Sequence, residues 1–109
     1  MTVNGLLSET GFNAINVADG ERKIRGAYMG DLLSWVMGRA REDNAWITIM
    51  SNVNVMAVAS LADVSCVILA EGVVLDDEVL EIAKQKGINV ISSPLAAYET
   101  AVKINGILK

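Results

Sequence analysis

Three short polar segments carry the residue types suited to binding a small ligand. They are Gly26 to Asp31, Ser51-Asn52-Val53-Asn54 and Ser92-Ser93-Pro94. Their hydroxyls, amides and backbone N–H groups can hydrogen-bond a phosphate, a ribose or a carboxylate without catalysing a reaction. We therefore predict a small anionic ligand, either a nucleotide or a phosphorylated metabolite. The predicted ligand-binding residues are Gly26, Gly30, Asp31, Ser51, Asn54, Ser92 and Ser93.

The same residue types have a purely structural use, which stays open. Asn, Ser, Asp and Gly are also what strand-to-helix turns need for caps. Neither nucleotide-binding fingerprint is complete, because "GAYMGD" departs from GxGxxG and no Gly-Lys-Ser/Thr loop occurs.

Catalytic groups are scarce in this chain. It has no histidine, which removes the commonest general base and the commonest zinc ligand. No spacing forces Asp31 together with Glu71 or Glu99 as an acid–base pair. Cys66 lies in the apolar run "SCVILA" and is expected to be a small buried hydrophobe. We therefore expect no catalytic site, no metal site and no cofactor.

The elements that position these segments follow from apolar periodicity and cap residues. Strand and helix alternate from residue 45 to the end. The predicted strands are 12–17, 23–29, 45–50, 65–70 and 88–93. The predicted helices are 2–11 (Thr2 as cap, Gly11 as end), 31–40 (Asp31 as N-cap), 53–62, 76–87 and 95–107 (Pro94 in its first turn).

This alternation predicts an α/β fold, a three-layer α/β/α sandwich around a mostly parallel sheet of about five strands. With 109 residues, a single domain over 1–109 is expected. Ligands in such sheets sit outside the carboxyl ends of the strands, where helix N-termini point. The three polar segments are expected to meet there, with Glu71 nearby.

The helix predicted over 31–40 has more apolar residues than one buried face requires. Leu32, Leu33, Trp35, Val36 and Met37 spread over roughly 200°, against the ~100° or somewhat more that a surface helix buries. We predict that Trp35 and Met37 lie outside the core and form a homodimer interface. The alternative is that the N-terminal helix covers them within one chain.

Overall composition excludes several classes of partner. The chain is 52% hydrophobic and 20% charged with a net charge of -4, which fits a globular protein and disfavours nucleic acid, since phosphate-backbone binding needs clustered cations. Polar residues interrupt the longest uncharged run, 44–62, so no membrane span is expected. The N-terminus lacks a basic region followed by a long apolar stretch, and a cytoplasmic location is expected.

The segments "GAYMGDLLSWVMGRA", "AWITIMSNVNVMAVASLADVSCVIL" and "INVISSPLAAYE" resemble the DRTGG domain family over about residues 20–100. Such domains are similar to the N-terminal domain of bacterial HPr kinase/phosphorylase and occur in CBS-domain pyrophosphatases and some phosphotransacetylases. The resemblance implies a regulatory or assembly module that commonly dimerises, without a catalytic role.

Two departures from the family pattern limit what can be carried over. The Asp-Arg-Thr-Gly-Gly string is absent, and Ser51-Asn52-Val53-Asn54 replaces a Thr-His-x-Asn turn. Only Asn54 carries over in that turn, whereas Gly30 and Asp31 match the pattern.

Three functions follow as hypotheses. The first is a stand-alone regulatory homodimer that binds a small anion or docks on a partner enzyme. The second is a structural adaptor without a ligand, and the third is a small phosphoryl- or acyl-transferase.

Overall fold

The computed structural model describes residues 1–108, and in this part of the chain five strands form one sheet in the order β1-β5-β4-β3-β2. Strands β2 to β5 are parallel, and β1 pairs antiparallel with β5. The α/β fold with a mostly parallel sheet is therefore confirmed. The elements are α1 (Val3–Thr10), β1 (Asn13–Asn16), β2 (Ala27–Met29), α2 (Leu33–Arg39), β3 (Ala45–Thr48), α3 (Val53–Ala62), β4 (Cys66–Leu69), α4 (Asp77–Lys86), β5 (Val90–Ser92) and α5 (Ala97–Leu108).

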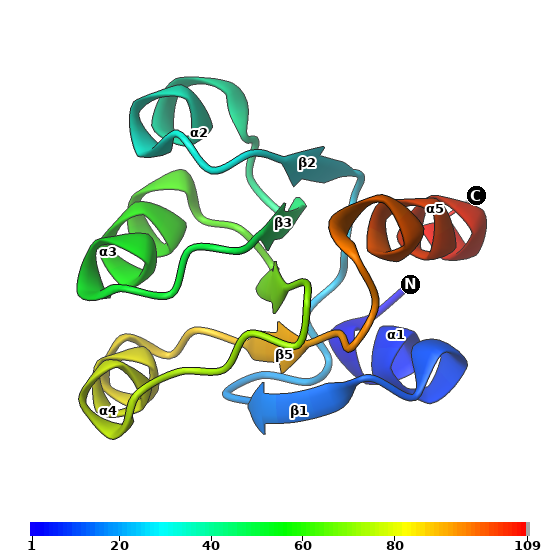
Figure 1. Cartoon of the computed structure of the whole chain (residues 1–109), viewed down its shortest axis with the longest axis horizontal. Helices are drawn as coiled ribbons and strands as arrows, with labels where there is room; N and C mark the ends of the chain where they lie inside the picture. Colours follow the sequence, from blue (N-terminus) through cyan, green and yellow to red (C-terminus); the bar gives the residue numbers. More distant parts are fainter. Residues whose placement is uncertain (109) are drawn as a thin grey trace.

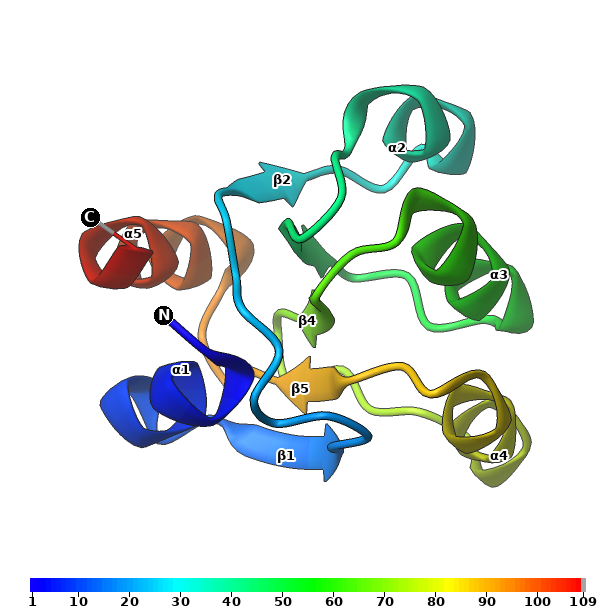
Figure 2. The same cartoon turned by 180° about the vertical axis from the view of Figure 1, so that it is seen from behind.

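Helices cover both faces of the sheet, as Figures 1 and 2 show. Helices α2, α3 and α4 lie on one face, and α1 and α5 lie on the other. Every residue of β3, β4 and β5 is buried, as their continuous apolar sequences predict. The core between the sheet and α2, α3 and α4 centres on Trp46 and Met56. The core between the sheet and α1 and α5 centres on Ile68 and Ile104. The three-layer sandwich is confirmed.

Most helix ends form where the sequence predicts them. Thr2 caps α1 by accepting a hydrogen bond from the Gly5 N–H at 3.0 Å. Gly11 and Gly87 end α1 and α4 in the left-handed conformation, with φ of 71° and 68°, which glycine adopts without steric cost.

Two predicted helix starts are wrong. Helix α2 begins at Leu33 after Leu32, whose side chain makes no capping hydrogen bond, so Asp31 is not its N-cap. The Asp31 carboxylate binds the next strand instead. Helix α5 begins at Ala97, so Pro94 precedes the helix rather than occupying its first turn.

The connection between β1 and β2 crosses the whole sheet, because these two strands form its opposite edges. We call residues 17–26 the crossing segment. It passes the ends at which β5, β4 and β3 begin, here named the amino edge; the ends at which β2 to β5 finish are the carboxyl edge. The strand predicted over 23–29 is shortened to Ala27–Met29, and Lys23 makes only an isolated bridge with Thr2. Among residues 1–108 no helix combines the length and the apolar character that crossing a membrane requires.

Candidate functional site

Asp31 joins the ends of β2 and β3 at the carboxyl edge. Its Oδ1 accepts a hydrogen bond from the Thr48 hydroxyl at 2.7 Å and another from the Ile49 N–H at 3.0 Å. The indole N–H of Trp46 donates to the Gly30 carbonyl at 2.9 Å. These bonds hold the turn after β2, which contains the predicted residues Gly30 and Asp31, against the end of β3.

A small hollow lies beside this turn. It has a volume of about 160 Å³ and is lined by Gly30, Asp31, Thr48 and Ala97 together with Met29, Ile47 and Ile49. Ala97 is the first residue of α5, and its N–H donates to Glu71 Oε2 at 2.8 Å. Pockets for drug-sized ligands measure roughly 300–1,000 Å³, so the hollow fits a small group rather than a whole nucleotide.

The other predicted ligand residues lie farther along the carboxyl edge or, for Gly26, at the amino edge. Ser51 and Asn54 lie at the start of α3, where Asn52 provides the cap by accepting from the Val55 N–H at 3.3 Å. Gly26 precedes β2 and therefore lies at the amino edge, away from the predicted site.

Ser92 and Ser93 are buried, and their hydroxyls serve the fold. Ser92 donates to the Val73 carbonyl at 2.9 Å, and Ser93 shares a hydrogen bond of 2.8 Å with Thr100. Strand β5 is three positions from β2 in the sheet, which is roughly 14 Å at the usual strand spacing. A single small ligand cannot contact both Ser92 and Gly30.

The cationic side chains are distributed unevenly between the two edges. Four helices, α2 to α5, begin at the carboxyl edge, where acidic side chains suit the positive ends of helix dipoles. The lysines and arginines of the described residues lie at the amino edge or, for Lys103, within α5. A polyanion at the carboxyl edge of the described chain would therefore meet helix N-termini but no cationic side chain. Its acids are Asp31, Glu71, Asp76, Asp77, Glu78 and Glu99.

The densest polar cluster is at the amino edge, and the sequence analysis missed it. Asn89 accepts from the Ala18 and Asp19 N–H groups at 2.8 and 2.9 Å and donates to the Asp19 and Ser65 carbonyls. Asn44 donates to the Arg25 carbonyl at 2.7 Å. The Ser65 hydroxyl bonds the carbonyls of residues 23 and 43.

The signal for this cluster was present in the sequence. Each of Asn44, Ser65 and Asn89 is a nearly fully buried polar residue shortly before a continuous apolar strand. Each binds the backbone of the crossing segment as it passes that strand. Because every buried side-chain polar atom within residues 1–108 has a partner, we assign this cluster a structural role.

Arg22 completes the amino edge as an ion-pair hub. Its Nη2 lies 3.0 Å from both Asp43 Oδ1 and Asp63 Oδ1. Partial burial lowers the pKa of Arg22, but the hydrogen bonds and charges of the two carboxylates outweigh that effect and raise the pKa overall. Arg22 therefore stays cationic and is engaged within the chain.

The prediction that Trp35 and Met37 lie outside the core is confirmed, with exposed fractions of 52% and 50%. Val36 between them is fully buried. At 100° per residue the two exposed side chains flank the outer face of α2, with Ser34 and Gly38 between them. The Arg39 guanidinium stacks 3.8 Å from the Trp35 ring centroid, which fixes the ring orientation.

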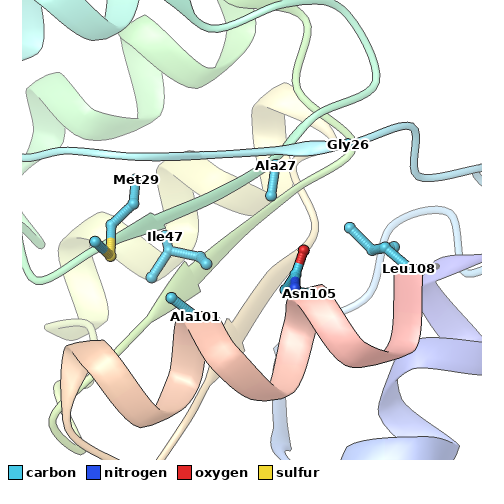
Figure 3. A pocket seen from close by; sticks show the side chains of 7 residues that line it. All are labelled: Gly26, Ala27, Met29, Ile47, Ala101, Asn105 and Leu108. Atoms are coloured by element: carbon cyan, nitrogen blue, oxygen red, sulfur yellow. The ribbon is translucent and has the colours of Figure 1, made fainter.

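A second hollow, larger than the first, is a groove of mixed polarity between the edge strand β2 and α5 (Figure 3). Its volume is about 410 Å³. Ala27 and Ala101 are too small to fill the space between strand and helix. The lining is completed by Gly26, Met29, Ile47, Asn105 and Leu108.

Cys66 is fully buried as expected, and burial raises the pKa of its thiol to about 12. A neutral buried thiol is a poor nucleophile. Residues 1–108 contain no cluster of three acidic or cysteine side chains that could hold a metal ion.

The sequence model of the DRTGG domain matches residues 26–107. This chain belongs to the DRTGG domain family. The match includes β2, α2, the hollow and all of the residues that line the groove except Leu108. A search of curated proteins gives no match to the domain.

Among solved structures, this DRTGG domain is similar to the CBS and DRTGG domains of the regulatory region of Clostridium perfringens pyrophosphatase, crystallised with the activator diadenosine tetraphosphate. The TM-score is 0.69 at 19% sequence identity. The match covers 98% of this chain and 46% of that chain, so the domain spans about half of the pyrophosphatase region. At this identity the likeness establishes a shared fold.

Proposed function

We propose that this DRTGG domain is a non-catalytic regulatory module that acts as a homodimer and transmits a signal to a partner enzyme. The observation that carries the proposal is a set of half-exposed apolar side chains on β2 and on the segment that follows it, namely Met29, Leu32, Trp35 and Met37. Each of these side chains is about half exposed. Trp and Met are enriched at interface centres, where truncating one anchor residue removes a large share of the affinity.

The homodimer is tested by sedimentation of Trp35→Ala. We expect a dimer for the parent chain and an increase in its dissociation constant of at least tenfold for the variant. Leu61→Ala is the matched control, because Leu61 is 71% exposed on α3. A monomeric parent chain, or equal effects of the two variants, contradicts the proposed interface.

A ligand that regulates the dimer must bind one of its states better than another. The relative described above was crystallised with a nucleotide activator, which supports a nucleotide or another small anion as the ligand here. The hollow beside Gly30 and Asp31 is the best candidate for one anionic group, and Ala97, the first residue of α5, also lines it. The acidic surroundings mean that one copy alone would bind a polyanion weakly.

Thermal shift measurements with diadenosine tetraphosphate, ATP and acetyl phosphate test this ligand, with adenosine as the uncharged control. A ligand at about 100 times its dissociation constant adds roughly 2.7 kcal/mol of stability. For a domain of this size that corresponds to a rise in Tm of about 10 °C or more. Asn54→Ala should leave the shift intact if the hollow is the site.

Sedimentation and the thermal shift panel together also distinguish the two alternative functions. A dimer with no thermal shift across the panel favours a structural adaptor that joins partners without a ligand. Turnover of acetyl phosphate or ATP by the pure domain would contradict the non-catalytic proposal and support a small transferase.

A further inference from the structure

Two of the three residues of strand β2 leave their backbone hydrogen-bonding groups unpaired. The Gly26 carbonyl accepts from Ala45 and the Gly30 N–H donates to Ile47, so residues 26, 28 and 30 face β3. Because successive residues of a strand point their backbone groups to opposite sides, Ala27 and Met29 direct theirs away from the sheet. These groups form a free edge.

Neither neighbouring helix covers this edge. In Figures 1 and 2, α2 lies over one face of the sheet and α5 over the other, and β2 is the outermost strand between them. The groove beneath β2 opens beside it (Figure 3). An uncovered edge strand is a template for pairing with another strand.

The sequence around β2 is complementary to itself. In Arg25-Gly26-Ala27-Tyr28-Met29-Gly30-Asp31, antiparallel pairing centred on Tyr28 places Ala27 opposite Met29 of a second copy. The unpaired groups on each strand are those of Ala27 and Met29, so both facing pairs exchange two backbone hydrogen bonds. The large Met29 side chain then lies beside the small Ala27 of the second copy.

Charge complementarity supports the same register. The pairing places Arg25 of each copy opposite Asp31 of the other. The Arg25 side chain is 73% exposed, and its Nε lies 3.9 Å from Asp43 Oδ2, a loose contact. Asp31 uses Oδ1 for its hydrogen bonds to Thr48 and Ile49. Parallel pairing would bring like charges together at both ends.

We infer that two copies join through antiparallel pairing of their β2 strands about a two-fold axis at Tyr28, giving one continuous sheet across the dimer. The inference rests on the proposed homodimer and specifies its register. Because the axis is perpendicular to the sheet, the α2 helices of the two copies lie on one face and the α5 helices on the other. Arg25 of the second copy then supplies a cation beside Asp31, at the hollow where one copy has none.

Disulfide cross-linking of the full chain tests the register. Ala27→Cys and Met29→Cys variants are purified separately, mixed and oxidised. Facing residues of an antiparallel pair have Cα atoms about 5.5 Å apart, within the range a disulfide spans. We expect the mixed 27–29 cross-link to form at least tenfold faster than the 27–27 or 29–29 cross-link. Buried Cys66 should not react in the parent chain, and Leu61→Cys measures random collision.

The outcomes distinguish the inference from the proposal on which it rests. A monomeric parent chain in sedimentation overturns both. A dimer in which the 27–29 cross-link forms no faster than that of Leu61→Cys overturns the β2 pairing and leaves the homodimer standing. Faster 27–27 and 29–29 cross-links would indicate parallel pairing and likewise overturn the inference.

Charge reversal gives a second test that does not depend on oxidation. Arg25→Glu should raise the dimer dissociation constant on the order of tenfold, because both opposite-charge pairs become repulsive. Lys84→Glu makes the same charge change at the end of α4, far from β2, and should leave the constant unchanged. Circular dichroism and melting of each variant at low concentration check the monomer fold. Equal effects of the two variants contradict the predicted charge pairing.

Discussion

The amino edge and the carboxyl edge of the same sheet use polar residues in opposite ways. At the amino edge, Asn44, Ser65 and Asn89 are nearly fully buried and bind the crossing segment. At the carboxyl edge, Asp31 and Glu71 make a few hydrogen bonds at the border of a solvent-open hollow. The first edge fixes the chain path, whereas the second has a hollow that is open to solvent.

The comparison shows why a cluster of polar residues is not by itself a binding site. A buried polar group whose hydrogen bonds are complete within the chain has nothing left to offer a ligand. The groups left incomplete are backbone N–H and C=O groups of β2 and the half-exposed side chains around it. Partners are therefore expected at the β2 edge rather than at the polar cluster.

The largest expected effect concerns Cys66, which begins β4 at the amino edge. Burial raises its thiol pKa from 9.0 to about 12, so between these pH values the folded chain binds more protons than the unfolded chain. The free energy of unfolding should therefore fall as pH rises from 9 to 12, by about 4 kcal/mol in all. Urea unfolding across this range should show that Cys66→Ala lacks this contribution. Identical slopes for parent and variant would mean that water reaches this end of the core.

The next largest effect is a difference in stability between two variants, one with a substitution at each edge. Asn89→Ala leaves the Ala18 and Asp19 N–H groups without their acceptor, and we expect a loss of about 3 kcal/mol in the free energy of unfolding. Asn54→Ala at the carboxyl edge should cost less than about 0.5 kcal/mol, because Asn54 is exposed. Chemical denaturation measures both, and similar losses would refute the assigned roles.

A smaller loss than that of Asn89→Ala is expected at Asp31. Asp31→Ala should cost about 1 kcal/mol through its lost hydrogen bonds to Thr48 and Ile49. The cause is tertiary, since Asp31 does not cap α2. In a double-mutant cycle Asp31→Ala should therefore cost less in a Thr48→Val background than in the parent chain. Additive losses would show that the two side chains are not coupled.

Part of the candidate site could be predicted because it depends on local patterns. Apolar runs correctly predict β3 and β4, and cap residues correctly predict the ends of α1 and α4. The excess apolar arc correctly placed Trp35 at the surface. Asp31 looked like an N-cap because it precedes a helix, but a hydroxyl on a neighbouring strand competes for the same carboxylate. That competitor lies 17 residues away in the chain.

The sequence by itself determined the elements, their alternation and the residues that end several helices, because periodicity and capping act within a few residues. Only the tertiary structure decided that β1 and β2 form the two edges. Strand order depends on which distant segments bury each other's faces, and no local pattern encodes it. That order sends residues 17–26 across the amino edge, moves Gly26 away from the predicted site and exposes the backbone of β2.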